Sequence, residues 1–366
     1  MDKVSNRQIF FMIFVAIIGG INIVIMPARL APISTGGVWV TMFITGAIFI
    51  LPLLAFCYLG NKFPCESMQQ YLPKVIGKVA AKIVLVAYYL YFSFAFIYFS
   101  KEFVYMLKIE ALPKTPFIVL LALIFITAIY ATSKGIKNVG RLMEFWIAIS
   151  IPLIIIVHIV MFEEGEVINM MPLFEKEQIG NYLKGVRMAL SGFFGIEILN
   201  FIPFDNKKRK SRKWYLLSAL LAGVVLYLIV IYSSYSILTI DDTGNFSNSL
   251  FAALRQIRIP ALQIFARIDI LSIIDWMIVS IGSICLLVYA ISSNFFAAFS
   301  INPKTWKVVL LCIPVGILSA IVPHDALLDD EVTICLGMTV SAFLPIIIAI
   351  IAFFRKVKGE VEYIDE

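Results

Sequence analysis

The residue best placed to do chemistry in this 366-residue chain is Glu197, which follows a glycine-rich break in an apolar segment. The segment runs from about residue 182 to 203. It carries Gly192 and Gly195 in its middle, and Asn200 lies one helical turn after Glu197 on the same face. An ionisable side chain at membrane depth costs at least about 2.5 kcal/mol unless it is paired or hydrated. Glu197 is therefore predicted to face an internal cavity, where it meets a ligand ammonium group or a proton. The alternative is a neutral carboxylic acid held by a neighbouring asparagine.

A matching break interrupts the first apolar segment of the chain, at residues 19–22. A proline closes each of the two interrupted segments, Pro27 in the first and Pro203 in the second. Glycine weakens a helix by about 1 kcal/mol relative to alanine. A pair of breaks at corresponding places therefore indicates that unwound backbone is useful there, as at the midplane binding sites of transporters.

The chemistry of unwound backbone suits a small zwitterion. The N-terminus of a half-helix attracts a carboxylate, and free carbonyl groups accept hydrogen bonds from an ammonium group, so an amino acid fits such a site. The alternative is that the glycines only allow helices to pack closely. The predicted binding residues are Gly20, Ile21, Asn22, Gly192, Phe193, Gly195 and Glu197.

A second acidic residue inside an apolar segment is Asp275. Ser272, Val279 and Gly282 share its helical stripe, and a small or polar stripe of this kind faces the interior of a membrane bundle. Asp275 and Asn200 are therefore candidates for a proton or polar pathway.

No other set of residues supports catalysis or a cofactor. The five cysteines are odd in number and lie mostly within apolar segments, and His158 and His324 are far apart in the chain. The sequence has no metal-ligand spacing, no phosphate-binding glycine loop and no nucleophile with its base. It predicts a binding protein that is not an enzyme, with no metal and no cofactor.

The composition predicts a single integral membrane domain over residues 1–366. Hydrophobic residues make up 61% of the chain and charged residues 15%, against about a quarter charged in soluble proteins. Aromatic residues crowd the third apolar segment, and most are expected to pack or to face lipid, with one or two of them forming part of the pocket wall. A membrane span needs about 20 apolar residues, and ten segments qualify: 8–27, 37–59, 79–107, 116–133, 142–162, 182–203, 214–238, 264–298, 305–323 and 332–354.

The ten predicted spans divide into two repeats, residues 8–162 and 182–354. Five spans per repeat invert the second relative to the first, which places the broken helices first and sixth. Basic residues concentrate in alternate connections, so both termini are predicted to be cytoplasmic, with a short tail at 355–366. The basic run at residues 207–213 is expected to contact membrane lipid and not nucleic acid.

Two connections are predicted to form short helices of their own. Residues 66–72 are amphipathic and are expected to lie along the inner membrane surface, and residues 250–254 to lie over an outer vestibule.

Several weak motifs, in their order and spacing, resemble one family over nearly the whole chain. They are Gly20-Ile21-Asn22 with Pro27-Ala28-Arg29-Leu30, Gly36-Gly37-Val38-Trp39, Tyr71-Leu72 with Gly77-Lys78, Lys114-Thr115-Pro116, Gly140-Arg141-Leu142, Phe193-Phe194-Gly195-Ile196-Glu197, and Arg267-Ile268-Asp269 ahead of Trp276. The chain is similar in these features to the B subunits of spore germination receptors, which belong to the amino acid–polyamine–organocation transporter superfamily.

The resemblance implies an all-α, LeuT-like bundle of ten helices in the spore inner membrane. It implies that the bundle binds a small-molecule germinant, usually an amino acid, and works with A and C receptor subunits. By position, the implied pocket residues are the seven named above. A proton-coupled amino-acid permease, with Glu197 or Asp275 carrying the proton, is the alternative that the residues leave open.

Overall fold

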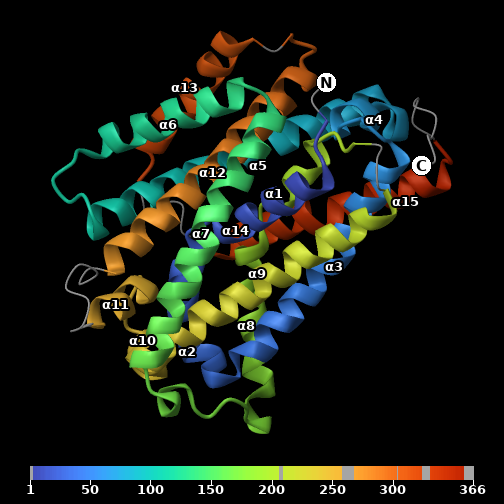
Figure 1. Ribbon diagram of the computed structural model, residues 1–366. Helices are drawn as coiled ribbons and strands as arrows, with labels where there is room; N and C mark the ends of the chain where they lie inside the picture. Colours follow the sequence, from blue (N-terminus) through green and yellow to red (C-terminus); the bar gives the residue numbers. More distant parts are fainter. Residues whose placement is uncertain (1–2, 206–208, 258–267, 303, 324–329, 358–366) are drawn as a thin grey trace.

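The computed structural model describes residues 3–205, 209–257, 268–302, 304–323 and 330–357. Within these ranges the regular secondary structure is helical apart from one isolated bridge between Val4 and Phe204. The α-helices are α1 (Asn6–Ile18), α2 (Asn22–Ser34), α3 (Val38–Lys62), α4 (Met68–Ile76), α5 (Lys78–Glu110), α6 (Phe117–Ser133), α7 (Ile136–Glu164), α8 (Ile179–Ala189), α9 (Arg209–Leu238), α10 (Ile240–Thr243), α11 (Ser249–Gln256), α12 (Ile268–Ala298), α13 (Thr305–Ile321), α14 (Asp330–Met338) and α15 (Leu344–Phe354) (Figure 1). The shorter elements are η1 (Thr35–Gly37), η2 (Val167–Met170), η3 (Lys176–Gln178), η4 (Leu190–Phe193), η5 (Ile196–Phe201) and η8 (Thr339–Phe343).

The helices confirm an all-α membrane protein. Six stretches within the described residues are long and apolar enough to cross a bilayer: Asn22–Lys62, Lys78–Glu110, Ile136–Glu164, Arg209–Leu238, Ile268–Ala298 and Glu331–Phe354. Three shorter apolar helices, α1, α6 and α13, lie at further predicted positions. The number of ten spans stays a prediction.

The first break lies where the sequence predicts it, because residues 19–21 separate α1 from α2. The prediction that Pro27 closes the segment is wrong, since α2 continues through it to Ser34. A proline inside a membrane helix is tolerated where other groups satisfy the backbone around it. Here the N–H of Ala28 donates to the Ser249 hydroxyl of α11 at 3.1 Å.

The second break is longer than the sequence predicts. α8 ends at Ala189, and the chain then passes through η4 and η5 without returning to an α-helix before Pro203. Gly195, between the two short helices, has a φ of 112°, a left-handed conformation that glycine adopts readily because it has no Cβ. This break therefore replaces the α-helical hydrogen bonds over most of the second half of the predicted span with the shorter-range bonds of two 3-10 helices.

The helices pack into two groups that cut across the two repeats. One group contains α1, α2, α3, α8 and α9, which are the first two members of each repeat. The other contains α5, α6, α12 and α13, which are the third and fourth members of each. Figure 1 shows α6 and α13 together at one edge and α3 at the opposite edge. This is the arrangement expected of two inverted repeats.

A short helix joins the second and third members of each repeat, as predicted. α4 packs against α5 and α15, and α11 packs against α2, α9 and α12. The two lie at opposite ends of the bundle (Figure 1). Near the C-terminus, the Arg355 side chain donates to the carbonyl of Val75 in α4 at 2.8 Å, so the last described helix ends on the α4 side.

A buried arginine ties several chain segments together at the α4 end of the bundle. The Arg212 guanidinium in α9 donates to the Asn6 side chain of α1 at 3.2 Å and to the carbonyl of Gly60 in α3 at 3.2 Å. It also donates to the Asn61 side chain at 2.5 Å and to the carbonyl of Asp205. Its partners are neutral oxygens on three separate segments, so this one side chain holds the N-terminus of α1 and the C-terminus of α3 against the residues that follow η5.

Candidate functional site

The main cavity lies between the two helix groups, at the level of both breaks. Its volume is about 130 Å³, roughly ten times what one water molecule requires, so it has room for a small organic molecule. Aromatic and aliphatic side chains form most of its wall. The polar residues that line it are Asn22, Arg29, Tyr91, Tyr98, Ser191, Glu197, Ser283 and Thr333.

Glu197 lies at one end of this cavity with its side chain only 1% exposed. Its Oε1 accepts a hydrogen bond from the Tyr91 hydroxyl at 2.9 Å, and its Oε2 accepts one from the Gly195 N–H at 2.7 Å. The left-handed turn at Gly195 is what aims this N–H back at the carboxyl group. The predicted alternative, a carboxyl group held by Asn22 or Asn200, is not found among the described contacts.

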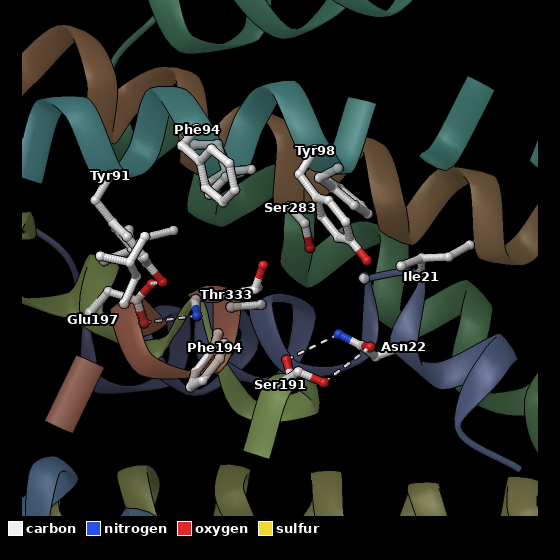
Figure 2. Close-up of a pocket in the computed structure, with 18 of the residues that line it drawn as sticks. Ile21, Asn22, Tyr91, Phe94, Tyr98, Ser191, Phe194, Glu197, Ser283 and Thr333 are labelled. Carbon is white, nitrogen blue, oxygen red and sulfur yellow. Dashed lines mark hydrogen bonds between the residues drawn. The ribbon is translucent and has the colours of Figure 1, made fainter. Parts of the chain in front are cut away.

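The two breaks are joined directly at the other end of the cavity. The side-chain amide of Asn22 donates to the carbonyl of Ser191 at 3.0 Å, and the Ser191 hydroxyl donates to the Asn22 side-chain oxygen at 3.3 Å. Figure 2 shows this pair at the opposite end from Glu197 and Tyr91. Asn22 is also the first residue of α2. The N–H groups of Val24 and Ile25 donate to the carbonyl of Ile21 at 3.0 and 3.3 Å, so the N–H groups of Asn22 and Ile23 are those of the first turn that lack a helical partner.

Side chains of neighbouring helices form hydrogen bonds with several of the carbonyl groups that lack helical partners at the two breaks. The Tyr227 hydroxyl of α9 contacts the carbonyls of Ile17 and Gly192 at 3.3 and 3.2 Å, and Trp276 of α12 donates from its indole N–H to the carbonyl of Gly20 at 3.3 Å. The sequence predicts that such carbonyls accept from a ligand ammonium group. Because protein donors already contact these carbonyls, the Glu197 carboxyl group is the stronger acceptor in the cavity.

Two of the predicted binding residues do not line the cavity. Phe193 is fully buried on the opposite face of the break, where its ring stacks on Phe49 with centroids 5.4 Å apart. A Cβ placed on Gly192 would lie 2.8 Å from the Tyr227 hydroxyl, so this glycine permits close packing, as the alternative interpretation proposes. Of the seven predicted residues, the five that do line the cavity are Gly20, Ile21, Asn22, Gly195 and Glu197.

The two residues of the candidate proton or polar pathway, Asn200 and Asp275, lie in different places in the bundle. Asn200 is buried outside the main cavity, and its side-chain amide lies 3.5 Å from the Tyr88 hydroxyl. Asp275 lines a second cavity together with His158 and Ser272. His324 and Arg267 lie outside the described residues.

Sequence reasoning expected one or two aromatic residues of the third apolar segment in the pocket wall but did not say which, and it missed the other lining residues named below. Tyr91, Phe94 and Tyr98 of α5 form one helical stripe, and Figure 2 shows Phe94 and Tyr98 pointing into the cavity from that helix. Their spacing of three and four residues was the available signal. Ser283 of α12, whose hydroxyl donates to the carbonyl of Val15 at 2.9 Å, and Thr333 of α14 carried no local signal.

No group of three or more His, Cys, Asp or Glu side chains that could hold a metal ion occurs in the part of the chain that the structure describes.

A membrane bundle whose two broken helices meet at a cavity between two helix groups is a LeuT-like bundle, the fold of several solute transporters. The chain is similar in structure to MhsT, solved in complex with L-phenylalanine, with a TM-score of 0.68 and 12% identity over 98% of this chain and 91% of that one. It is also similar to a Na⁺-coupled sialic acid symporter, with a TM-score of 0.67 and 14% identity over 93% and 78% of the two chains. These likenesses establish the fold.

The sequence comparison establishes the family. The family model described as spore germination protein matches residues 3–326, so the chain belongs to the spore germination protein family. Among its relatives from Bacillus subtilis (strain 168), spore germination protein A2 is 23% identical over 272 residues, covering 74% of each chain. Spore germination protein KB is 23% identical over 294 residues, covering 79% of this chain and 76% of that one.

Proposed function

We propose that this chain is the ligand-binding membrane subunit of a spore germinant receptor and that its germinant is a small amino acid. Membership of the spore germination protein family supports the biological role. The observation that carries the choice of ligand is the pairing of a buried carboxyl group at one end of the cavity with a helix N-terminus at the other.

The geometry suits the two charged groups of an amino acid. The ammonium group donates to the Glu197 carboxylate, which already has two protein donors and keeps lone pairs for a third. The ligand carboxylate lies at the first turn of α2, next to Asn22, where the partial positive charge of a helix N-terminus stabilises it. Arg29, which also lines the cavity, adds positive charge on the same helix.

The wall between these two ends sets the size and polarity of the ligand side chain. Phe94, Phe99 and Phe194, together with aliphatic residues, surround the space between the polar ends. A cavity of about 130 Å³ favours a small amino acid with a short apolar side chain over a long or charged one. Aromatic faces near an ammonium group add a favourable cation–π contribution of about 0.5–2 kcal/mol.

The signalling step needs partners, which we propose to be the A and C subunits of the receptor. We further propose that the chain lies in the spore inner membrane with the α4 end in the cytoplasm. The concentration of basic residues in the predicted inner connections supports this orientation.

The second candidate function is a proton-coupled amino-acid permease, and one observation favours it. A third cavity of about 770 Å³ opens at the α4 end and is lined by polar residues that include Ser67, Thr132 and Lys304. An aromatic cluster separates the main cavity from this third cavity. In the cluster, the Phe201 ring packs edge-on against Tyr88 and Phe92, with ring centroids 4.9 and 5.6 Å apart. A permease must open this barrier in each cycle, whereas a receptor need not.

Binding and flux measurements on the purified chain separate the two functions. The protein is reconstituted in nanodiscs and in liposomes, and a panel of radiolabelled amino acids is tested for binding and for uptake with and without a proton gradient. The receptor hypothesis expects saturable binding of a small amino acid without uptake above that of empty liposomes. Gradient-driven uptake would establish the permease, and failure of every amino acid to bind would refute the proposed ligand class.

A further inference from the structure

A second cavity lies across the first break from the main one. Its volume is about 60 Å³, several times what one water molecule requires. Ile18 and Ile23, on either side of the break, line the second cavity, whereas Gly20 and Asn22 line the main one. The unwound segment is therefore a wall shared by the two cavities.

The second cavity contains a carboxylate without a cationic partner. Asp275 lines it and is only 7% exposed. Within the described ranges no lysine, arginine or histidine nitrogen lies within 4.0 Å of its oxygens, and its hydrogen-bond partner is the neutral hydroxyl of Ser150. By contrast, the buried carboxylate of Glu110 nearer the α11 end pairs with Arg255. In its ionised form a buried carboxylate needs a compensating positive charge, so an ionised Asp275 favours a cationic occupant of the cavity.

The other titratable group in this cavity is a second hydrogen-bond acceptor. His158 of α7 lies with its Nδ1 2.8 Å from the Ser233 hydroxyl of α9. The Ser233 hydroxyl also lies 3.1 Å from the carbonyl of Val230, and in the tautomer in which it donates to that carbonyl, Nδ1 carries the hydrogen and donates to Ser233. In the neutral ring, Nε2 is then left as an acceptor.

The described charged groups of α11 and of the first turn of α12 contact partners outside this cavity. Arg255 of α11 pairs with Glu110 and lies 4.0 Å from Asp269 of α12. The rest of the lining is apolar except for Ser272, whose hydroxyl donates to the carbonyl of Ile268, and Trp276. Among the described residues, the occupant therefore meets two acceptors, one aromatic ring and no lysine or arginine side chain.

We propose that this second cavity binds a small ammonium-type cation, held between the Asp275 carboxylate and His158 beside the Trp276 ring. An ammonium ion carries the charge that the carboxylate needs and donates N–H groups to both acceptors. The indole face adds a cation–π contact. Hard metal cations take shells of six or more oxygens, which this lining of one carboxylate, one imidazole and aliphatic groups does not offer. The volume admits ammonium or methylammonium and excludes most amino acids.

The cation site is coupled to the main cavity through Trp276. Its indole N–H donates to the carbonyl of Gly20, which lines the main cavity, and its ring lines the second one. A cation beside the ring therefore biases the conformation of the break. This part of the inference rests on the proposed function, since it predicts that ammonium changes the affinity for the amino acid and that the amino acid changes the affinity for ammonium by the same factor.

The site is tested first without any amino acid. Thermal unfolding of the protein in nanodiscs is measured in chloride salts of ammonium, methylammonium, sodium, potassium and choline at equal ionic strength and fixed pH. We expect ammonium to raise Tm saturably, by on the order of 1–3 °C at ten times its Kd, and sodium and choline not to. Asp275→Asn removes the shift and His158→Leu weakens it. Asp241→Asn, which neutralises an exposed carboxylate, leaves the shift unchanged and is the matched control.

Three results overturn the proposal. The first is an ammonium shift of equal size in Asp275→Asn, and the second is an equal shift with sodium or potassium in the unmodified protein. The third is a Tm that does not respond to ammonium but depends on pH in a way that Asp275→Asn abolishes, because the occupant is then a proton. The coupling is tested separately, by measuring the affinity for the amino acid with and without ammonium. If ammonium raises Tm but does not change that affinity, the coupling is refuted and the cation site is retained.

Discussion

Replacing Glu197 with glutamine tests the central assignment of the main cavity, because it removes one charge and keeps the shape of the side chain. The amide oxygen accepts the hydrogen bond from the Gly195 N–H, and the amide nitrogen donates to the Tyr91 oxygen, since a hydroxyl group also accepts. Both local contacts therefore survive. We expect Glu197→Gln to insert and fold normally, with a thermal unfolding midpoint close to that of the unmodified protein.

The cost to binding follows from the loss of a buried charge pair. Truncating one partner of such a pair at an interface costs about 2–5 kcal/mol, and each 1.4 kcal/mol is a factor of ten in Kd. Glu197→Gln should therefore raise the Kd for the amino acid from about 30-fold to a few thousand-fold. The side chain is almost fully buried, so water does not replace the lost charge.

The assay compares each amino acid that binds with its analogue lacking the amino group. Binding to protein in nanodiscs is measured by scintillation proximity for both ligands and both proteins. The unmodified protein should prefer the amino acid, and Glu197→Gln should lose most of that preference while its affinity for the analogue changes little. An unchanged Kd together with an unchanged preference for the amino group would refute the role of Glu197 as the ammonium acceptor.

Three further changes test other parts of the site and the bundle. Tyr91→Phe removes the hydroxyl that donates to the Glu197 carboxylate, a hydrogen bond worth about 1.5–3 kcal/mol. It should raise the Kd for the amino acid about tenfold or more in the same binding assay, and an unchanged Kd would contradict the role of the hydroxyl. Gly195→Ala forces a left-handed φ of 112° on a residue with a Cβ and should cost about 1–3 kcal/mol of stability, measured as a lower Tm. Gly180→Ala is the control and should not lower Tm, because a Cβ at that position meets no atom within 4 Å. Arg212→Lys leaves several buried oxygens without donors and should cost at least about 2 kcal/mol in chemical denaturation, against little change in the exposed control Lys213→Gln.

The positions of the membrane helices and of both breaks could be predicted from the sequence. A bilayer offers no hydrogen bonds to the backbone, so every span must be a long apolar run, and such a run is a local property of the chain. Glycines at matching places in two of these runs were enough to find both breaks. The short helices α4 and α11 were visible for the same reason, as polar or amphipathic stretches between apolar ones.

The extent of each break depended on distant side chains. Pro27 was predicted to end its helix, but Ser249, far along the chain, satisfies a backbone N–H beside it, and α2 continues. In the second break, Tyr227 and Asn22 contact carbonyl groups at Gly192 and Ser191. These partners allow the backbone to stay unwound over more residues than its glycines alone indicated.

Which side chains face the cavity was decided only by the tertiary structure. Phe193 and Phe194 are neighbours of the same type, yet the first packs into the core and the second lines the cavity, because the turn before Gly195 directs them to opposite sides. Asp275 and Glu197 looked alike in the sequence, as acidic residues within apolar runs. The packing of α12 places Asp275 in a separate cavity with His158, because the rotation of a helix about its axis is set by the neighbours that it contacts and not by its own hydrophobicity.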